Sequence, residues 1–294
     1  MVGDDVETQR AMVSAALAAG ITYFDTAAGY GEGRSEQNLG AALRSSAGSP
    51  VISTKVALEL PDLGDIFGSV VRSVESSLLR LGRSRVEMLV LHNRVARSTD
   101  YPKPPGSGAL LHLPEVFGSG GVAEAFRSLM DEGLVGSVGF TAFGGEPSAI
   151  EEMIGCGLFT SMNASYNLLN PSAKFSMPVA FSEPDYECVI DKAEQAGIGV
   201  MAIRVLSSGA LVESADRDHR VGRFAAVARE VGISLPELAI RFVLSTEGVQ
   251  TAIMGLSEPS HLAAAVEAAS NGPLEAAVMH EIEAIATSGI TSES

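Results

Sequence analysis

Short apolar runs alternate with segments of helical periodicity along almost the whole chain, and this alternation restricts the possible folds more than any other feature. Apolar runs of strand length begin near residues 21, 51, 87, 136, 160, 200 and 250. Helical spacing predicts helices over residues 5–19, 35–45, 65–81, 121–132, 147–154, 184–195, 259–269 and 274–286, with two more helices between the strands near 200 and 250. Repeated strand–helix units are typical of a parallel sheet. The length of 294 residues fits one domain, so we predict an α/β fold with a single TIM-type (β/α)8 barrel over residues 1–294.

Polar side chains stand where three of these predicted strands end. Asp25 ends the run ITYFD, Lys55 ends VISTK and His92 ends VEMLVLH, while Tyr30 follows Asp25 in a glycine-rich turn. The carboxyl ends of the strands of such a barrel open onto one face, where the chemistry of these folds is concentrated. A carboxylate, a phenol, an ammonium and an imidazole meeting there form a site that can donate a proton.

Composition excludes several classes of protein. Acidic residues outnumber basic residues 36 to 20, giving a formal charge of −16, which argues against nucleic acid or an anionic membrane as partner. Cys156 and Cys188 lie far apart in the sequence without a CxxC motif, so we expect neither a disulfide framework nor a metal site. Such sparse cysteines favour a reducing compartment for the protein. The polar N-terminus is no secretory signal, and no apolar run is long enough to span a membrane. The sequence therefore predicts a cytoplasmic protein.

One connection is unusually long. Residues 93–119 link the strand that ends at His92 to the next helix, whereas most such loops have about 2–6 residues. We interpret this segment as a flap on the substrate side of the barrel, with a solvated insertion as the alternative.

Several segments resemble one known family. The stretch FDTAAGYGEGRSEQNLGAAL, followed in order by STK, VLH, NASYNLLNP and IMGLSEPSHL, is similar to the signature segments of the aldo-keto reductases, and the resemblance covers about residues 8 to 270. It implies an eight-stranded α/β barrel that transfers a hydride between a nicotinamide cofactor and an aldehyde or ketone.

The resemblance also implies catalytic roles for the four polar residues. Tyr30 would be the general acid, Lys55 would lower the pKa of the phenol, Asp25 would hold Lys55, and His92 would orient the carbonyl oxygen. Taken singly, each of them has a structural alternative as a packing, solvated or capping residue. A structural role is expected for Arg34, Ser35 and Glu36, with Ser35 as the N-cap of the next helix.

Cofactor ligands are implied in the same way, with departures from the family pattern. Thr141 and Asn163 would hold the carboxamide, although Ala142 replaces an amide side chain, and Ile203 or Arg204 would cover the nicotinamide ring. Further ligands implied for the pyrophosphate and the adenosine end are Arg204, Ser207, Ser208, Gly209, Gly255, Ser257, Glu258 and His261. The adenosine segment contains no Lys or Arg, so the family preference for NADP(H) over NAD(H) is reduced to a slight one.

The family begins with a hairpin and a first barrel strand, whereas this chain starts on a helix, so we expect that the hairpin and the first strand are absent. Truncation, a strand supplied by another chain and an open barrel are the explanations, of which truncation or a misplaced start is preferred. The predicted function is an NAD(P)(H)-dependent oxidoreductase that interconverts an aldehyde or ketone, including sugar-like ones, and the alcohol, with a small-molecule carbonyl as its substrate. The alternative is a non-catalytic nicotinamide-binding sensor or accessory protein, or a truncated inactive homologue.

Overall fold

The computed structural model describes residue 2 and residues 6–44, 49–103, 108–211, 219–256 and 258–287. The chain forms two compact units, each of which is described by itself. Unit 1 runs up to Met162 and includes Glu258 and Pro259, and unit 2 contains Asn163–Leu256 and the residues from Ser260 onward. The prediction of a single domain over residues 1–294 stays a prediction.

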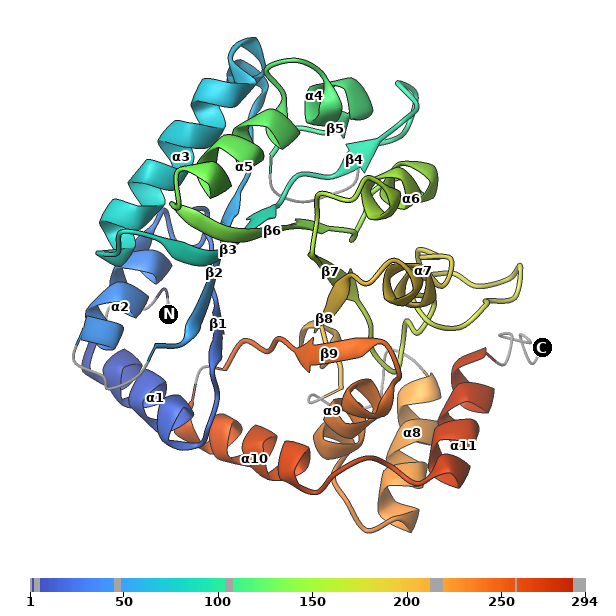
Figure 1. Cartoon of the computed structure of the whole chain (residues 1–294). Helices are drawn as coiled ribbons and strands as arrows, with labels where there is room; N and C mark the ends of the chain where they lie inside the picture. The colour runs from blue at the N-terminus through green and yellow to red at the C-terminus, as the bar shows by residue number, and fades with distance from the viewer. Residues whose placement is uncertain are drawn as a thin grey trace. The chain divides into compact units, whose positions relative to one another are not determined.

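Unit 1 is built on parallel strands in the order β1-β2-β3-β6 (Figure 1). Their bounds are Tyr23–Asp25, Val51–Val56, Val86–Leu91 and Val135–Thr141. The strands are short and mostly buried, because helices cover them, as expected for a parallel sheet. Parallel pairing brings their carboxyl ends to one edge, where Asp25 is the last residue of β1, Lys55 is the last but one of β2, and His92 follows directly after β3.

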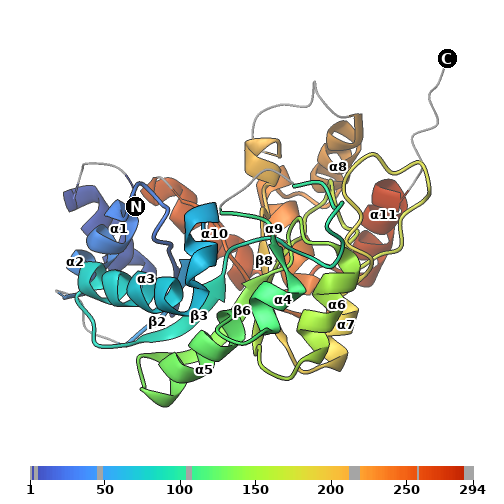
Figure 2. The ribbon, with the colours of Figure 1, turned by 90° about the horizontal axis from the view of Figure 1, so that it is seen from above.

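Helices of unit 1 pack beside these strands, and Figure 2 shows α2 and α3 alongside β2 and β3. The bounds are α1 Val6–Ala18, α2 Arg34–Arg44, α3 Ile66–Leu81, α4 Leu113–Phe117, α5 Val122–Asp131, α6 Pro147–Gly155 and the 3-10 turn η1 Leu60–Gly64. Helix α3 shows how nearby residues determine where a helix begins and ends. The Asp65 carboxylate accepts a hydrogen bond from the Gly68 N–H at its start, and Gly82 ends it in the left-handed conformation at φ 64°.

The long connection after His92 has secondary structure that the sequence did not predict, and its role as a flap on the substrate side stays a prediction. It contains the strands β4 (Val95–Ala96) and β5 (Leu111–His112), which pair in parallel, and then helix α4. The Asn93 side chain is fully buried and hydrogen-bonds Leu58 N and O and Ala109 O at 2.8–2.9 Å. The described part of the connection is therefore fixed to the loop that follows β2.

A second set of contacts fixes the same connection to the loop before α6. The Glu146 carboxylate accepts from the N–H groups of Arg97 and Ser98 at 2.7 and 2.8 Å, and the Tyr101 hydroxyl donates to the Gly145 carbonyl at 3.1 Å. Backbone and side-chain hydrogen bonds thus hold this segment as a structured layer of unit 1.

Unit 2 has its strands in the order β7-β8-β9, with β8 and β9 parallel. Its elements are β7 Ser161–Ser165, which begins in unit 1, α7 Val189–Gln195, β8 Gly199–Ile203, η2 Ser207–Gly209, α8 His219–Glu230, α9 Leu235–Ser245, β9 Val249–Ala252, α10 Pro259–Ser270, which also begins in unit 1, and α11 Ala276–Thr287. Ser234 is the N-cap of α9, and its hydroxyl accepts a hydrogen bond from the Glu237 N–H at 3.2 Å.

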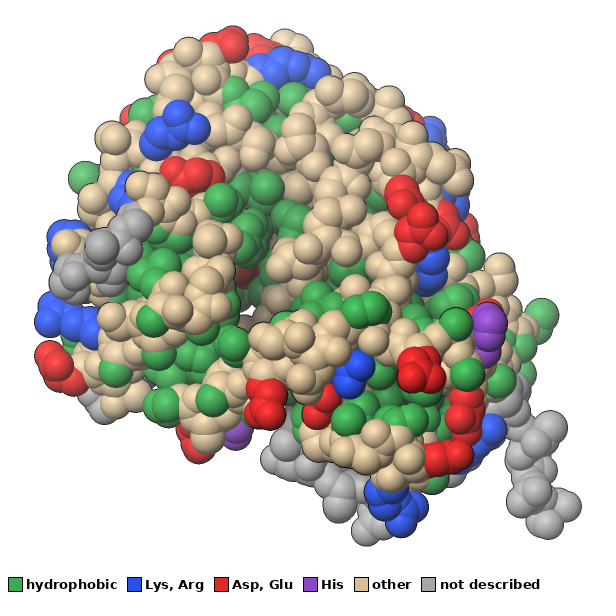
Figure 3. Space-filling model, turned by 60° about the horizontal axis from the view of Figure 1, so that its bottom comes forward, with side chains coloured by type: hydrophobic (Ala, Val, Ile, Leu, Met, Phe, Trp, Pro, Cys, Tyr) green, Lys and Arg blue, Asp and Glu red, His purple; other side chains and the backbone are tan. Residues whose placement is uncertain are grey.

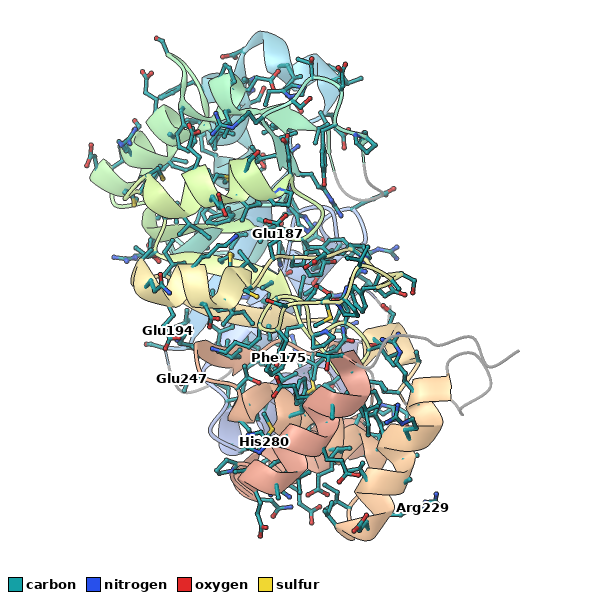
Figure 4. The ribbon with its side chains drawn as sticks, turned by 90° about the vertical axis from the view of Figure 1, so that its right-hand side faces the viewer. Phe175, Glu187, Glu194, Arg229, Glu247 and His280 are labelled. Carbon is teal, nitrogen blue, oxygen red and sulfur yellow. The ribbon has the colours of Figure 1, made fainter. Side chains whose placement is uncertain are left out.

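Helix α7 begins later than the predicted residue 184. Glu187 and Cys188 take the left-handed conformation with φ 51° and 54°, and only the residues after them are helical (Figure 4). Helical spacing in a sequence does not reveal two such backbone positions, which explains the error.

The seven predicted strands of the main sheet are all present. Among the described residues no strand precedes β1, and the eight-stranded barrel and the absence of the first strand stay predictions. Acidic and basic side chains lie in small separate groups on the face drawn in Figure 3. Within the described ranges, no helix combines the length and apolar character that crossing a membrane requires.

Candidate active site

A tight turn between β1 and α2 carries Tyr30. The Tyr30 N–H donates to the Ala27 carbonyl at 3.1 Å, and its own carbonyl accepts from the Ser35 N–H at 3.2 Å. Gly33 has φ 86°, and a Cβ atom there would lie 2.5 Å from Cδ of Arg80, so both its conformation and its contact require glycine. The Tyr30 side chain projects from this turn with 39% of its surface exposed, which leaves it accessible to a small molecule.

A buried ion pair joins the carboxyl-terminal parts of β1 and β2. The Lys55 ammonium donates to Oδ2 of Asp25 and, at 2.7 Å, to the carbonyl oxygen of Thr26. The two side chains are 3% and 10% exposed. Burial raises the pKa of the Asp25 carboxyl, and the charge of Lys55 acts in the opposite direction. The pairing expected from the sequence is present, and it compensates for the cost of burying a lone ammonium.

Tyr30 and His92 lie beside this pair. The Lys55 ammonium lies 4.9 Å from the centroid of the Tyr30 ring, and the Tyr30 and His92 ring centroids are 6.0 Å apart with an interplanar angle of 81°. The structure thus brings together in unit 1 all four residues predicted to be catalytic.

The state of His92 follows from its surroundings. Burial first, and then the charges of Lys55 and Arg94, lower the pKa of His92 to about 4. The imidazole is therefore neutral at pH 7, with one ring nitrogen as hydrogen-bond donor and the other as acceptor. A neutral imidazole can donate to a carbonyl oxygen without adding a positive charge to the site.

A second buried network, centred on Glu36 of α2, holds the helix that follows the Tyr30 turn. The fully buried Glu36 carboxylate accepts from Thr54 Oγ1 at 2.5 Å and from Arg80 Nε at 2.6 Å. The hydroxyls of Thr26 and Ser35 are hydrogen-bonded at 2.8 Å. Glu36 thus connects α2, α3 and the residue before Lys55, in keeping with the structural role expected for it. The expectation for Ser35 was wrong in detail, because α2 begins at Arg34 and the Ser35 side chain is used inside the helix.

The two residues predicted to hold a carboxamide share one property. Thr141 at the end of β6 and Asn163 on β7 are both buried, at 4% and 2% exposed. Oγ1 of Thr141 and Oδ1 of Asn163 make no hydrogen bond to any residue that the structure describes. Buried polar atoms in folded proteins usually have a partner, so each is suited to an added polar ligand.

Comparison with known proteins decides the family. The sequence profile of the Aldo/keto reductase family matches residues 4–287. The chain belongs to this family. It is accordingly an oxidoreductase of the aldo-keto reductase family, and the family implies a nicotinamide cofactor and a small carbonyl substrate.

Curated relatives of this aldo-keto reductase are distant. It is 26% identical to D-threo-aldose 1-dehydrogenase of Pseudomonas sp, over 86% of this chain and 80% of that protein. It is 24% identical to L-glyceraldehyde 3-phosphate reductase of Escherichia coli O157:H7, over 90% of this chain and 80% of that protein. The structure of aldo-keto reductase AKR11C1 from Bacillus halodurans in its holo form matches 99% of this chain and 91% of its own with a TM-score of 0.76 and 21% identity, which is a likeness in fold.

Unit 2 of the aldo-keto reductase carries the residues predicted for the pyrophosphate. Arg204, Ser207 and Ser208 have φ values of 60°, 48° and 55°, which are uncommon for residues other than glycine, and Gly209 follows at 97°. The Ser207 hydroxyl donates to Oδ1 of Asn167 at 2.7 Å. Strained backbone of this kind is often found at binding sites, and it marks the end of β8 as a candidate.

For the residues predicted to bind the adenosine end of the cofactor, the structure gives only their exposure. Gly255, Glu258 and His261 are exposed, and Ser257 lies outside the described residues. Their roles, like those of the other predicted site residues, stay predictions.

Sequence reasoning missed Ser53, a fully buried serine of β2 that lies opposite Asp25 in the β1–β2 pairing. It also missed the contact between Thr54 and Glu36. The alternation of side chains along VISTK is the signal that could have found both, since it places Ser53 on the face of Lys55 and Thr54 on the opposite face.

Proposed function

We propose that this aldo-keto reductase is an NAD(P)(H)-dependent oxidoreductase that interconverts an aldehyde or ketone and the corresponding alcohol, with Tyr30 as the general acid. The observation that carries the proposal is the arrangement in unit 1. The Lys55 ammonium is ion-paired with Asp25 and lies 4.9 Å from the Tyr30 ring, and the His92 ring is 6.0 Å from the same ring.

The four side chains divide the work of reduction. The Tyr30 hydroxyl gives its proton to the carbonyl oxygen, and the positive charge of Lys55 stabilises the phenolate that remains. Asp25 keeps the ammonium charged and in place. The neutral His92 donates a hydrogen bond to the same carbonyl oxygen and so orients it. The nicotinamide cofactor, when bound, supplies the hydride.

Cofactor binding is assigned to residues that fit the parts of a dinucleotide. The unsatisfied oxygens of Thr141 and Asn163 suit a carboxamide, and Arg204, Ser207 and Gly209 suit a pyrophosphate. The proposal retains Gly255, Ser257, Glu258 and His261 for the adenosine end. With no Lys or Arg in that segment, NADP(H) is favoured only slightly over NAD(H).

The substrate class is inferred from the relatives. They include a D-threo-aldose 1-dehydrogenase and an L-glyceraldehyde 3-phosphate reductase, whose names indicate sugar-type substrates. We therefore infer a small, sugar-like carbonyl compound or its alcohol.

One observation favours a second function, a nicotinamide-binding sensor or accessory protein without turnover. Ala142 stands where the family pattern has an amide side chain, and it removes one polar group beside Thr141. The geometry of the four residues in unit 1 argues against this alternative.

The test uses the full chain, NADPH, NADH and a panel of aldehydes, ketones and aldoses. Cofactor fluorescence measures binding, and cofactor absorbance measures turnover. Oxidation of either cofactor that depends on an added carbonyl is the expected result. Saturable cofactor binding without turnover of any carbonyl compound in the panel would refute the reductase function and support the sensor function.

A further inference from the structure

We propose that Ser53 is a positioning residue for the Asp25–Lys55 pair, with its buried hydroxyl donating to the carboxylate oxygen of Asp25 that Lys55 leaves free. The inference rests on the proposed function, because it assigns a support to the ion pair of that site. It concerns residues of unit 1 alone.

The backbone places Ser53 next to both members of the pair. In the parallel pairing of β1 and β2, Asp25 lies opposite Ser53. Ser53 and Lys55 are two residues apart on β2, so their side chains point to the same face of the sheet. The three side chains therefore meet on one face, with Ser53 fully buried.

A donor and an acceptor are left over at this point. Asp25 Oδ2 accepts from Lys55, whereas Asp25 Oδ1 and Ser53 Oγ are buried and complete no well-aligned hydrogen bond within the described part of the chain. They belong to paired residues of neighbouring strands whose side chains share one face, and the Ser53 hydroxyl accordingly lowers the pKa of the Asp25 carboxyl. A hydrogen bond from the Ser53 hydroxyl to Asp25 Oδ1 would satisfy both groups at once.

The other nearby acceptor for the Ser53 hydroxyl, the Tyr23 phenol, is weaker than the Asp25 carboxylate. The neighbouring Tyr23 phenol donates to Sδ of Met88 at 3.5 Å, and the Ser161 hydroxyl donates to the same sulfur at 3.1 Å. Tyr23 can still accept from Ser53, but a carboxylate is the stronger acceptor because a charged partner roughly doubles the strength of a hydrogen bond.

The charged and titratable groups around the pair are few. Tyr23 on β1, Tyr30 in the following turn and His92 after β3 face it, and the charge of Arg94 acts on His92. The Glu36–Arg80 pair of α2 and α3 contacts Thr54, whose side chain points away from this face. Asp25 is thus the carboxylate that Ser53 influences, and loss of the hydroxyl favours its protonated form.

The first measurement is the titration of Asp25, which does not depend on the binding of cofactor or substrate. The carboxyl carbon of Asp25 is followed by NMR as a function of pH in the cofactor-free protein labelled with 13C-aspartate, and Asp25→Asn identifies the resonance. In Ser53→Ala the proton affinity of Asp25 should rise about tenfold. Ser161→Ala, which removes another buried hydroxyl of unit 1, should leave the titration unchanged.

Kinetics supply the second readout. The acid limb of the pH profile of kcat/KM should move upward in Ser53→Ala, with kcat at pH 7 reduced and KM for the carbonyl little changed. An Asp25 titration that is the same in Ser53→Ala and wild type overturns the inference. A shifted titration in a protein that never turns over a carbonyl upholds the role of Ser53 and refutes the proposed function, so the two failures are distinguishable.

Discussion

His92 should make the protein acid-sensitive by an amount that can be calculated. Its pKa is lowered to about 4, from 6.5 for an unperturbed histidine, so on acidification the unfolded chain takes up the proton first. The stabilisation is present above pH 6.5 and is lost as the pH falls from there to about 4. Between pH 7 and pH 5 this linkage removes about 2 kcal/mol of the free energy of unfolding.

The assay is urea unfolding of wild type and His92→Asn at pH 7, 6 and 5. Asparagine does not titrate, so the free energy of unfolding of the variant should fall by about 2 kcal/mol less than that of wild type over this range. Titration of Asp25 and other groups affects both proteins and largely cancels. His280→Asn is the matched control, because that histidine is exposed on α11 and is solvated in both states (Figure 4). Equal pH dependence of wild type and His92→Asn would refute the argument.

Two further substitutions test the supports of the site. Arg80→Met leaves the buried Glu36 carboxylate without its cation and should lower the free energy of unfolding by about 3 kcal/mol, measured by urea unfolding. Arg72→Met removes an exposed ion pair and should leave the unfolding midpoint nearly unchanged; a loss as large as that of Arg80→Met would contradict the account. Gly108→Ala puts a Cβ 2.4 Å from the Asn93 amide at φ 78° and should destabilise by more than about 1 kcal/mol, whereas a neutral effect would show that the connection after β3 is not fixed there.

Much of the fold could be predicted from the sequence because strong local signals agree with the tertiary structure. The helix predicted over residues 65–81 is found at Ile66–Leu81, since an acidic N-cap, an apolar stripe and a terminal glycine all act within that segment. The positions of Asp25 and Lys55 near the ends of their strands were visible because each charged residue follows a short run of strand-forming residues.

What could not be predicted depends on contacts between distant residues. The two-residue strands β4 and β5 have no periodicity of their own and exist only because they pair with each other. Likewise, side-chain alternation along β2 places Ser53 on the face of Lys55, but its position beside Asp25 follows only from the register of β1 and β2. The carboxamide residues were named through resemblance, and only the structure revealed that their side-chain oxygens are buried and make no hydrogen bond to any described residue.

The most direct test of the central claim is a single-turnover experiment with Tyr30→Phe. Protein with bound reduced cofactor is mixed with an aldehyde that wild type reduces, and cofactor absorbance is followed. Because the exposed Tyr30 ring is kept and only its hydroxyl is lost, cofactor affinity should stay within a few-fold while the rate of cofactor oxidation falls by at least about 100-fold. A rate within a few-fold of wild type would contradict the claim that Tyr30 supplies the proton.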